Sequence, residues 1–250
     1  MTQLAGPSRS PAREYGGAQQ VNDPINLVLI GPPGSGKGTQ AARICRRYQV
    51  SAISTGEVLR AAVKAGTPLG RQVQQVLASG VLVSDGLIID LVRTRLAEPD
   101  AAGGFVLDGF PRTLAQAQAL DCILEDRPLL VLLLVVPEAE LERRLGARRI
   151  CSTCKALYST GTRYGSEAEL CSRCGGMLIR RDDDNLGVIR TRLATYRETA
   201  QPIVRHYQSR SSLVAIDGMA GTGRVTRAMM AAIEDARVGS TARSKKSVTR

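Results

Sequence analysis

The residues with the plainest chemical potential lie in segment 31–39, which reads Gly-Pro-Pro-Gly-Ser-Gly-Lys-Gly-Thr. This is the pattern of a phosphate-binding loop, whose glycines leave backbone N–H groups free to point at phosphate oxygens. Lys37 adds a positive charge for the β and γ phosphates. Such loops usually carry Ser or Thr directly after the lysine, whereas Gly38 precedes Thr39 here, which argues against direct magnesium ligation by a hydroxyl. The segment predicts a nucleoside triphosphate site, with a chance glycine-rich turn as the alternative.

A second group of polar residues indicates a second substrate that carries phosphate. Asp108 follows the apolar residues 105–107, at the carboxyl end of a predicted strand, where open α/β sheets bind ligands. A carboxylate beside a polyphosphate requires a cation between them, so a Mg²⁺ shell is its natural partner. Arg112 can hold a phosphate through two hydrogen bonds, and Gln116 offers both a donor and an acceptor to an adenine edge. The alternative for Asp108 is an ordinary turn at a strand end.

Arginine gathers in the part of the chain that follows Leu141. Phosphoryl transfer to a phosphate needs charge neutralisation and exclusion of water more than a general base, and a closing lid could bring several guanidinium groups onto the transferring group. The candidates are Arg144, Arg148, Arg149, Arg181 and Arg192. For any single arginine the alternative is a solvated helix face. An RNA-binding surface is the alternative for the whole group, although such surfaces usually offer more stacking aromatics than this region has.

The six cysteines include two Cys-x-x-Cys pairs, with sixteen residues between them. This spacing is typical of a four-cysteine zinc site, and four thiolates leave no coordination position for water or substrate. The ligands are Cys151, Cys154, Cys171 and Cys174. The metal would be structural, with iron or a pair of disulfides as alternatives. Cys45 and Cys122 are expected to be buried packing residues, and the sole histidine, His206, is expected to have a surface or packing role.

The elements that must position these groups follow from the apolar pattern. Short apolar runs predict strands at 25–30, 51–53, 105–107, 129–136 and 213–216, and helical periodicity predicts helices at 38–48, 56–65, 69–78, 87–96 and 222–235. The alternation predicts an α/β fold with a parallel sheet covered by helices on both faces. A small helical insertion is expected between the second and third strands. Segment 149–182, where apolar periodicity disappears, predicts a second insertion that cannot hold itself by hydrophobic burial.

Composition places these elements in an ordinary globular chain of 250 residues, with 43% hydrophobic and 23% charged residues, and no stretch is long enough to span a membrane. Cysteine usage indicates a reducing compartment, so a cytoplasmic protein is expected. Residues 1–24 predict a disordered extension, and a transit peptide is disfavoured by Glu14 and Asp23. The net charge of +11 is placed unevenly, because residues 237–250 carry five basic residues and no acid. They predict a basic disordered tail.

Taken in order, these motifs resemble those of the adenylate kinase family from about residue 27 to 235. The phosphate loop matches the family's Gly-x-Pro-Gly-x-Gly-Lys-Gly-Thr, and residues 108–113 match Asp-Gly-Phe-Pro-Arg-Thr. Residues 54–60 resemble Ser-Thr-Gly-Asp-x-Leu-Arg, although Glu57 departs from it and the segment alone also fits a helix N-cap. Some members carry a four-cysteine lid. The resemblance implies Mg²⁺-dependent transfer between ATP and AMP, with ADP as product and with structural Zn²⁺ in the lid.

The resemblance also assigns residues. For ATP it implies Gly34, Ser35, Gly36, Lys37, Gly38, Thr39, Arg144, Arg148, Leu157, Tyr158 and Ala220. For AMP it implies Thr55, Arg60, Val81, Leu82, Val83, Gly109, Phe110, Pro111, Arg112, Gln116, Arg181 and Arg192. The catalytic set would be Lys37, Asp108, Arg112, Arg148, Arg181 and Arg192.

The fold implied is a P-loop kinase with a five-stranded parallel sheet. Its kinase domain would span 25–236, with core segments 25–53, 84–146 and 185–236, an acceptor-binding insertion at 54–83 and a lid at 147–184. A monomer is expected, with weak nucleic-acid or acidic-surface contact through the tail. The alternatives are a related kinase that uses GTP, CMP or UMP, and a zinc-ribbon nucleic-acid binder with a degenerate phosphate loop.

Overall fold

A computed structural model describes residues 24–125, 127–159 and 170–247, so the expected disorder of residues 1–23 lies outside the described part. Its central sheet has five parallel strands in the order β2-β3-β1-β4-β8. These are β1 (Ile25–Ile30), β2 (Ser51–Ser54), β3 (Gly104–Asp108), β4 (Leu130–Val135) and β8 (Leu213–Asp217). The predicted α/β fold is confirmed, with strand ends within a residue or two of the apolar runs.

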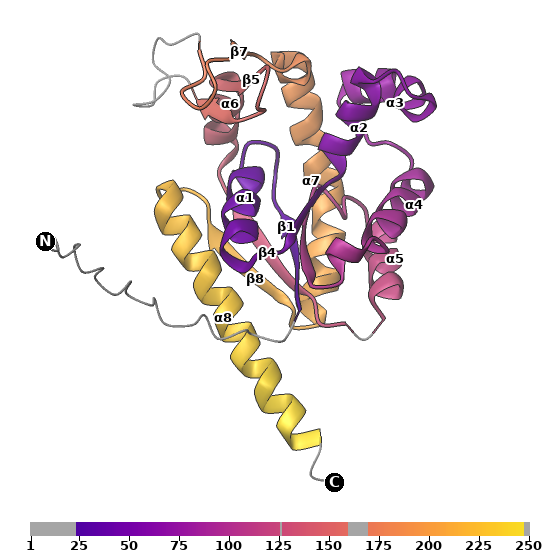
Figure 1. Ribbon diagram of the computed structural model, residues 1–250, viewed down its shortest axis with the longest axis vertical. Coiled ribbons are helices and arrows are strands. Elements are labelled where there is room, and N and C mark those ends of the chain that lie inside the picture. Colours follow the sequence, from indigo (N-terminus) through magenta and orange to yellow (C-terminus); the bar gives the residue numbers. More distant parts are fainter. Residues whose placement is uncertain (1–23, 126, 160–169, 248–250) are drawn as a thin grey trace, which may run out of the picture.

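Helices cover both faces of this sheet (Figure 1). The described helices are α1 (Lys37–Tyr48), α2 (Thr55–Lys64), α3 (Pro68–Ser79), α4 (Asp85–Leu96), α5 (Leu114–Leu124), α6 (Glu138–Gly146), α7 (Leu186–Ser209) and α8 (Thr222–Ser247). Alternation along β1 sets the two core layers, because Leu27 and Leu29 pack with α1 and α8, whereas Val28 and Ile30 pack with α4, α5 and α7. Short 3₁₀ turns lie at Pro99–Ala101 and Asp182–Asp184.

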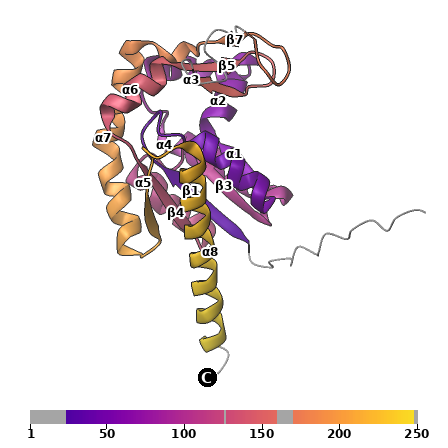
Figure 2. The same ribbon diagram turned by 90° about the vertical axis from the view of Figure 1, so that its left-hand side faces the viewer.

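Two insertions rise from one end of the sheet. The first insertion consists of α2 and α3, which follow β2 and precede α4. The second is a three-stranded antiparallel sheet, which follows α6 and consists of β5 (Arg148–Cys151), β6 (Leu157–Ser159) and β7 (Leu178–Ile179). Both insertions lie at the upper end of the molecule in the two views, opposite the end toward which α8 runs (Figures 1 and 2). No helix in the described ranges is long and apolar enough to cross a membrane.

The last helix is longer than its sequence predicts. Helix α8 continues to Ser247 rather than ending near Asp235. Residues 248–250 lie outside the described part, and the disorder expected for residues 237–250 stays a prediction. Residues 236–247 contain no proline, and Ala, Arg and Lys favour helix. Ile233 is the last buried residue of α8 among the positions up to 238 whose burial the structure describes. Val238 is 70% exposed, and α8 leaves the body of the protein (Figure 2).

Three residues outside the motifs can also be compared with their predictions, namely Cys45, Cys122 and His206. Cys122 is exposed, so its predicted burial is wrong, and Cys45 is only half-buried. The face of α5 that packs inward carries Ala117, Leu120 and Leu124, which leaves position 122 turned outward. His206 on α7 has a packing role, because its Nε2 lies 2.6 Å from Oδ2 of Asp121 on α5.

Candidate functional site

The phosphate loop lies between the end of β1 and the start of α1. Gly36 precedes α1 in a left-handed conformation and supplies no side-chain cap, so the helix N-terminus is open to an anion. Gly34 also has a positive φ of 83°, and a Cβ there would lie 2.9 Å from Cγ of Leu145 on α6. The Lys37 ammonium donates hydrogen bonds to the carbonyl oxygens of Gly31 at 2.7 Å and Pro32 at 3.0 Å. The lysine therefore folds back over its own loop.

Strand register brings Asp108 to this loop. In the parallel pairing, Asp108 at the end of β3 lies beside Leu29 of β1 and Ser54 of β2. A Cβ built on Gly38 would lie 3.3 Å from Oδ2 of Asp108, so a serine or threonine at this position would need the carboxylate to shift by a few tenths of an ångström. A carboxylate beside a phosphate loop fits a Mg²⁺ ion held mainly by phosphates and water.

Arginines from three parts of the chain surround the phosphate loop and Asp108. Arg112 follows β3, Arg148 begins β5 in the lid, and Arg192 lies on α7. Two aspartates of the 182–184 turn balance part of this charge: Arg148 pairs with Asp184 through two hydrogen bonds, and Arg192 Nη1 lies 3.1 Å from Oδ2 of Asp183. These aspartates were missed in the sequence, where they belong to none of the motifs. Arg192 also lies 3.4 Å from Asp184, so the turn ties α7 to the lid.

The positive charge at this point exceeds the negative charge. Burial, then the neighbouring Arg148 and Arg60, lower the pKa of Arg181 to about 10. The buried Nε of Arg181 has no hydrogen-bond partner among the described residues. Burial also lowers the pKa of Arg112 and of Arg192. Guanidinium groups that lower one another's pKa in this way are stabilised in their charged form by an anion between them. The arginine cluster is therefore suited to hold several phosphates.

The pKa of Lys37 is also affected by this excess of positive charge. Burial lowers the pKa of Lys37 to about 8; Asp108 opposes this change, and Arg112, Arg192 and Arg148 add to it. Phosphates would favour the charged ammonium, so its pKa must rise when nucleotide binds, and binding above pH 8 must take up a proton. Below pH 7 the ammonium is already present in the empty site.

The first prediction follows from that proton uptake. The dissociation constant of an ATP analogue is expected to rise about tenfold between pH 7 and pH 9, because most of Lys37 is neutral at the higher pH before binding. Isothermal titration calorimetry at the two pH values measures this, and Lys37→Met should bind weakly with little dependence on pH. A wild-type dissociation constant that stays constant from pH 7 to pH 9 would contradict the assignment.

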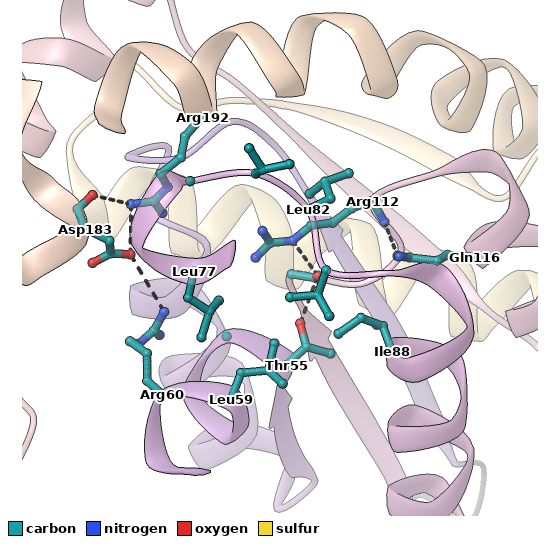
Figure 3. Close-up of a pocket in the computed structure, with 15 residues that line it drawn as sticks. Thr55, Leu59, Arg60, Leu77, Leu82, Ile88, Arg112, Gln116, Asp183 and Arg192 are labelled. Carbon is teal, nitrogen blue, oxygen red and sulfur yellow. Dashed lines mark hydrogen bonds and ion pairs between the residues drawn. The ribbon is translucent and has the colours of Figure 1, made fainter. Parts of the chain in front are cut away.

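A pocket opens beside the arginine cluster, between α2, α3 and the β3–α5 connection (Figure 3). Of the residues that the sequence predicts for AMP, its lining includes Thr55, Arg60, Val81, Leu82, Val83, Gly109, Arg112, Gln116 and Arg192. Phe110, Pro111 and Arg181 do not line it, and Phe110 lies in the main core. The lining also includes Leu59, Leu77 and Ile88, which the sequence marked only as helical apolar positions.

The carbonyl of Gly109, a residue of the pocket lining, joins two of its neighbours. It accepts hydrogen bonds from Oγ1 of Thr55 at 3.0 Å and from Nε of Arg112 at 2.8 Å. Thr55 is the first residue of α2, so this contact fixes the start of the helical insertion against the end of β3. Arg60, one and a half turns further along α2, lies 4.0 Å from Asp183 across the pocket mouth (Figure 3). The pocket combines apolar walls with cations at one side, as a nucleoside monophosphate requires.

The remaining residues predicted for ATP lie on the other side of the loop. Leu157 of β6 comes within 4.0 Å of a Cβ built on Gly38, whereas the Tyr158 hydroxyl faces the cysteines instead. Arg144 is held apart from the arginine cluster, because it pairs with Glu140 and donates to the carbonyl of Gly218 at 3.0 Å. Its place is next to the loop after β8, where Ala220 lies half-buried. Arg149 donates only to backbone carbonyls.

The four predicted ligand cysteines meet in the lid. Their sulfur atoms all lie within 4.8 Å of one another, and the shortest separations are 3.5 Å, between Cys151 and Cys174 and between Cys154 and Cys171. A disulfide requires about 2.05 Å, so the disulfide alternative is excluded. Backbone N–H groups and the Tyr158 hydroxyl donate toward these sulfurs, and the Tyr158 contact is the largest cause of lowering the pKa of Cys171 to about 6. Such a donor set fits Zn²⁺.

Comparison with known proteins gives a consistent result. A family model described as adenylate kinase matches residues 29–212. The chain is 44% identical over 213 residues to an adenylate kinase of Desulfitobacterium hafniense (strain DSM 10664 / DCB-2), covering 84% of this chain and 98% of that protein. It is 46% identical over 213 residues to one of Salinispora tropica, covering 84% and 97%. With an adenylate kinase of Archaeoglobus fulgidus it shares 43% identity over 197 residues, covering 78% and 91%.

Proposed function

This chain belongs to the adenylate kinase family, and from that premise we propose that it converts ATP and AMP reversibly into two ADP. The observation that carries the proposal is the convergence of Lys37, Asp108 and the arginine cluster next to a pocket with apolar walls. A phosphate loop alone would also suit a GTPase or a motor. The adjoining acceptor pocket favours transfer to a second nucleotide.

In the proposed reaction, the ATP phosphates lie on residues 34–39, with the Lys37 ammonium released from its loop carbonyls onto the β and γ phosphates. The AMP phosphate lies on Arg60, Arg112 and Arg192, and attacks without a general base because it already carries most of two negative charges near neutral pH. Asp108 would hold Mg²⁺, which neutralises charge between the phosphates. The lid arginines Arg148 and Arg181 then stabilise the charge of the transferring group.

Closure of the lid excludes water from the site. Water would otherwise accept the phosphoryl group in place of AMP. We propose that Zn²⁺ on the four cysteines holds the lid in shape without taking part in the chemistry. The base of AMP lies against residues 81–83 and the Gln116 amide, and the base of ATP lies near Leu157 and Ala220.

A substrate panel tests this proposal. AMP, GMP, CMP and UMP are each assayed as acceptor with ATP and with GTP as donor, and the pair ATP and AMP is expected to give the highest kcat/KM. Preference for CMP or UMP would instead favour a pyrimidine nucleotide kinase. No turnover with any pair would favour the nucleic-acid-binding alternative.

We further propose that the protein acts as a cytoplasmic monomer, and that the basic residues of 237–250 add a weak attraction to RNA. The prediction is that full-length protein retains RNA at low salt and releases it as salt rises, because the contact is electrostatic. Filter binding at two salt concentrations measures this. A chain lacking residues 238–250 is the matched control, and retention of the same affinity by that chain would remove the tail from the account.

A further inference from the structure

Asp85, the first residue of α4, lies directly behind the pocket that we assign to AMP. Its Oδ1 accepts a hydrogen bond from Nε2 of Gln116 at 2.7 Å, and its Oδ2 accepts one from Oγ1 of Thr113 at 2.9 Å. Gln116 lines the pocket and is only 2% exposed, whereas Asp85 does not line it. Asp85 therefore acts on a ligand only through Gln116.

The Gln116 amide is held in one orientation. Its Oε1 accepts a hydrogen bond from the backbone N–H of Arg112 at 2.7 Å (Figure 3), whereas its Nε2 donates to Asp85. The Arg112 N–H can only donate, and an ionised carboxylate can only accept. Turning the amide by half a turn would place its NH₂ against the N–H and its oxygen against the carboxylate. The Arg112 N–H and the Asp85 carboxylate therefore both oppose that rotation.

An amide held in one orientation presents its hydrogen-bond donor and acceptor to a base in one fixed order. After these contacts Gln116 keeps one N–H and one oxygen lone pair for a ligand. The adenine edge presents an amino donor beside the N1 acceptor, and hypoxanthine presents the reverse order, an O6 acceptor beside an N1–H donor. A glutamine that can rotate would serve both bases, whereas a fixed one serves only one of them.

We propose that Asp85 is a positioning residue that sets the specificity of the acceptor pocket for 6-aminopurine over 6-oxopurine monophosphates, by fixing the polarity of the Gln116 amide. The proposal rests on the assignment of this pocket to the acceptor base. A purely structural role for Asp85 is the competing explanation, because an acid in the first turn of a helix stabilises it, and Asp85 also bonds the N-cap residue of α5. That role would affect all acceptors equally.

The test compares AMP with inosine monophosphate as acceptors for wild type and Asp85→Ala, with ATP as donor. The ratio of the two kcat/KM values is expected to fall about tenfold in the variant. Most of the fall should come from a lower KM for inosine monophosphate, which the freed amide can then also bind, with kcat at saturating AMP within about threefold of wild type. Because both acceptors are assayed on one preparation, the ratio does not depend on the fraction of folded enzyme.

Two further variants sharpen the result. Asp90→Ala removes an acid from the same helix whose side chain is 75% exposed, and it should leave the ratio unchanged. Asp85→Asn keeps an acceptor for Gln116 and can donate its own NH₂ to the Thr113 hydroxyl, so it should retain a ratio within about threefold of wild type. An unchanged ratio in Asp85→Ala, or equal weakening of both acceptors, would overturn the proposal. Wild type without AMP turnover would instead overturn the proposed function.

Discussion

Replacing Lys37 with methionine is expected to lower kcat by about 10³-fold, because a preorganised cation aimed at the transferring phosphoryl is lost and water cannot replace it in a closed site. The methionine side chain fills a similar volume without a charge. Since burial lowers the pKa of Lys37 to about 8, folding disfavours the charged ammonium, and thermal stability should fall little when the charge is removed. A coupled assay of ADP formation measures the rate.

The matched control is Lys64→Met. Lys64 is an exposed residue in the last turn of α2, so the same change of side chain is made outside the site. It should keep kcat within about twofold of wild type, as surface substitutions rarely affect function. If Lys37→Met kept more than about a tenth of the wild-type kcat, the ammonium could not have the role in transfer that we assign to it.

The second large effect is expected when the cysteine cluster is broken. The lid strands are two to four residues long. Leu170, Met177 and Ile179 are exposed, so in the described part of the lid hydrophobic burial contributes little to its stability. Cys171→Ser should reduce bound zinc and lower kcat at least about tenfold, because Arg148 and Arg181 depend on the shape of the lid. Metal analysis and the coupled assay measure the two quantities.

Cys122→Ser controls for the loss of a thiol, because Cys122 is exposed on α5 away from the lid. It should keep both metal and activity. Hydrogen exchange should become faster in β5 and β7 of Cys171→Ser while the central sheet stays protected. Full activity together with a wild-type metal content in Cys171→Ser would contradict a structural metal site, and wild type without metal would contradict it as well.

Much of the architecture could be predicted because it follows from local patterns. The five apolar runs gave the strands of the sheet, and the glycine pattern before Lys37 gave the phosphate loop, since both signals are contiguous in the chain. The cysteine spacing likewise predicted a cluster that the fold brings together. Each of these features depends on residues that are neighbours in sequence, or on a spacing that chemistry restricts strongly.

What could not be predicted depends on contacts between distant segments. The bond from Asp85 to Gln116 joins the starts of two helices that are 31 residues apart, and no local pattern indicates it. Asp183 and Asp184 belong to none of the motifs, and only the fold places Arg148 and Arg192 beside them. The end of α8 was missed for a different reason, because the apolar periodicity ends at Ile233 whereas the helix continues past these core-facing positions.

We infer that two nucleotides bind at once, with their phosphates meeting between Lys37 and the arginine cluster. A crystal structure with a dinucleoside pentaphosphate that joins both adenosines tests it most directly. We predict phosphate oxygens about 3 Å from Nζ of Lys37 and from the Arg112 guanidinium, with one adenine against Gln116. A complex in which Lys37 and Arg112 both point away from the phosphates would contradict the account.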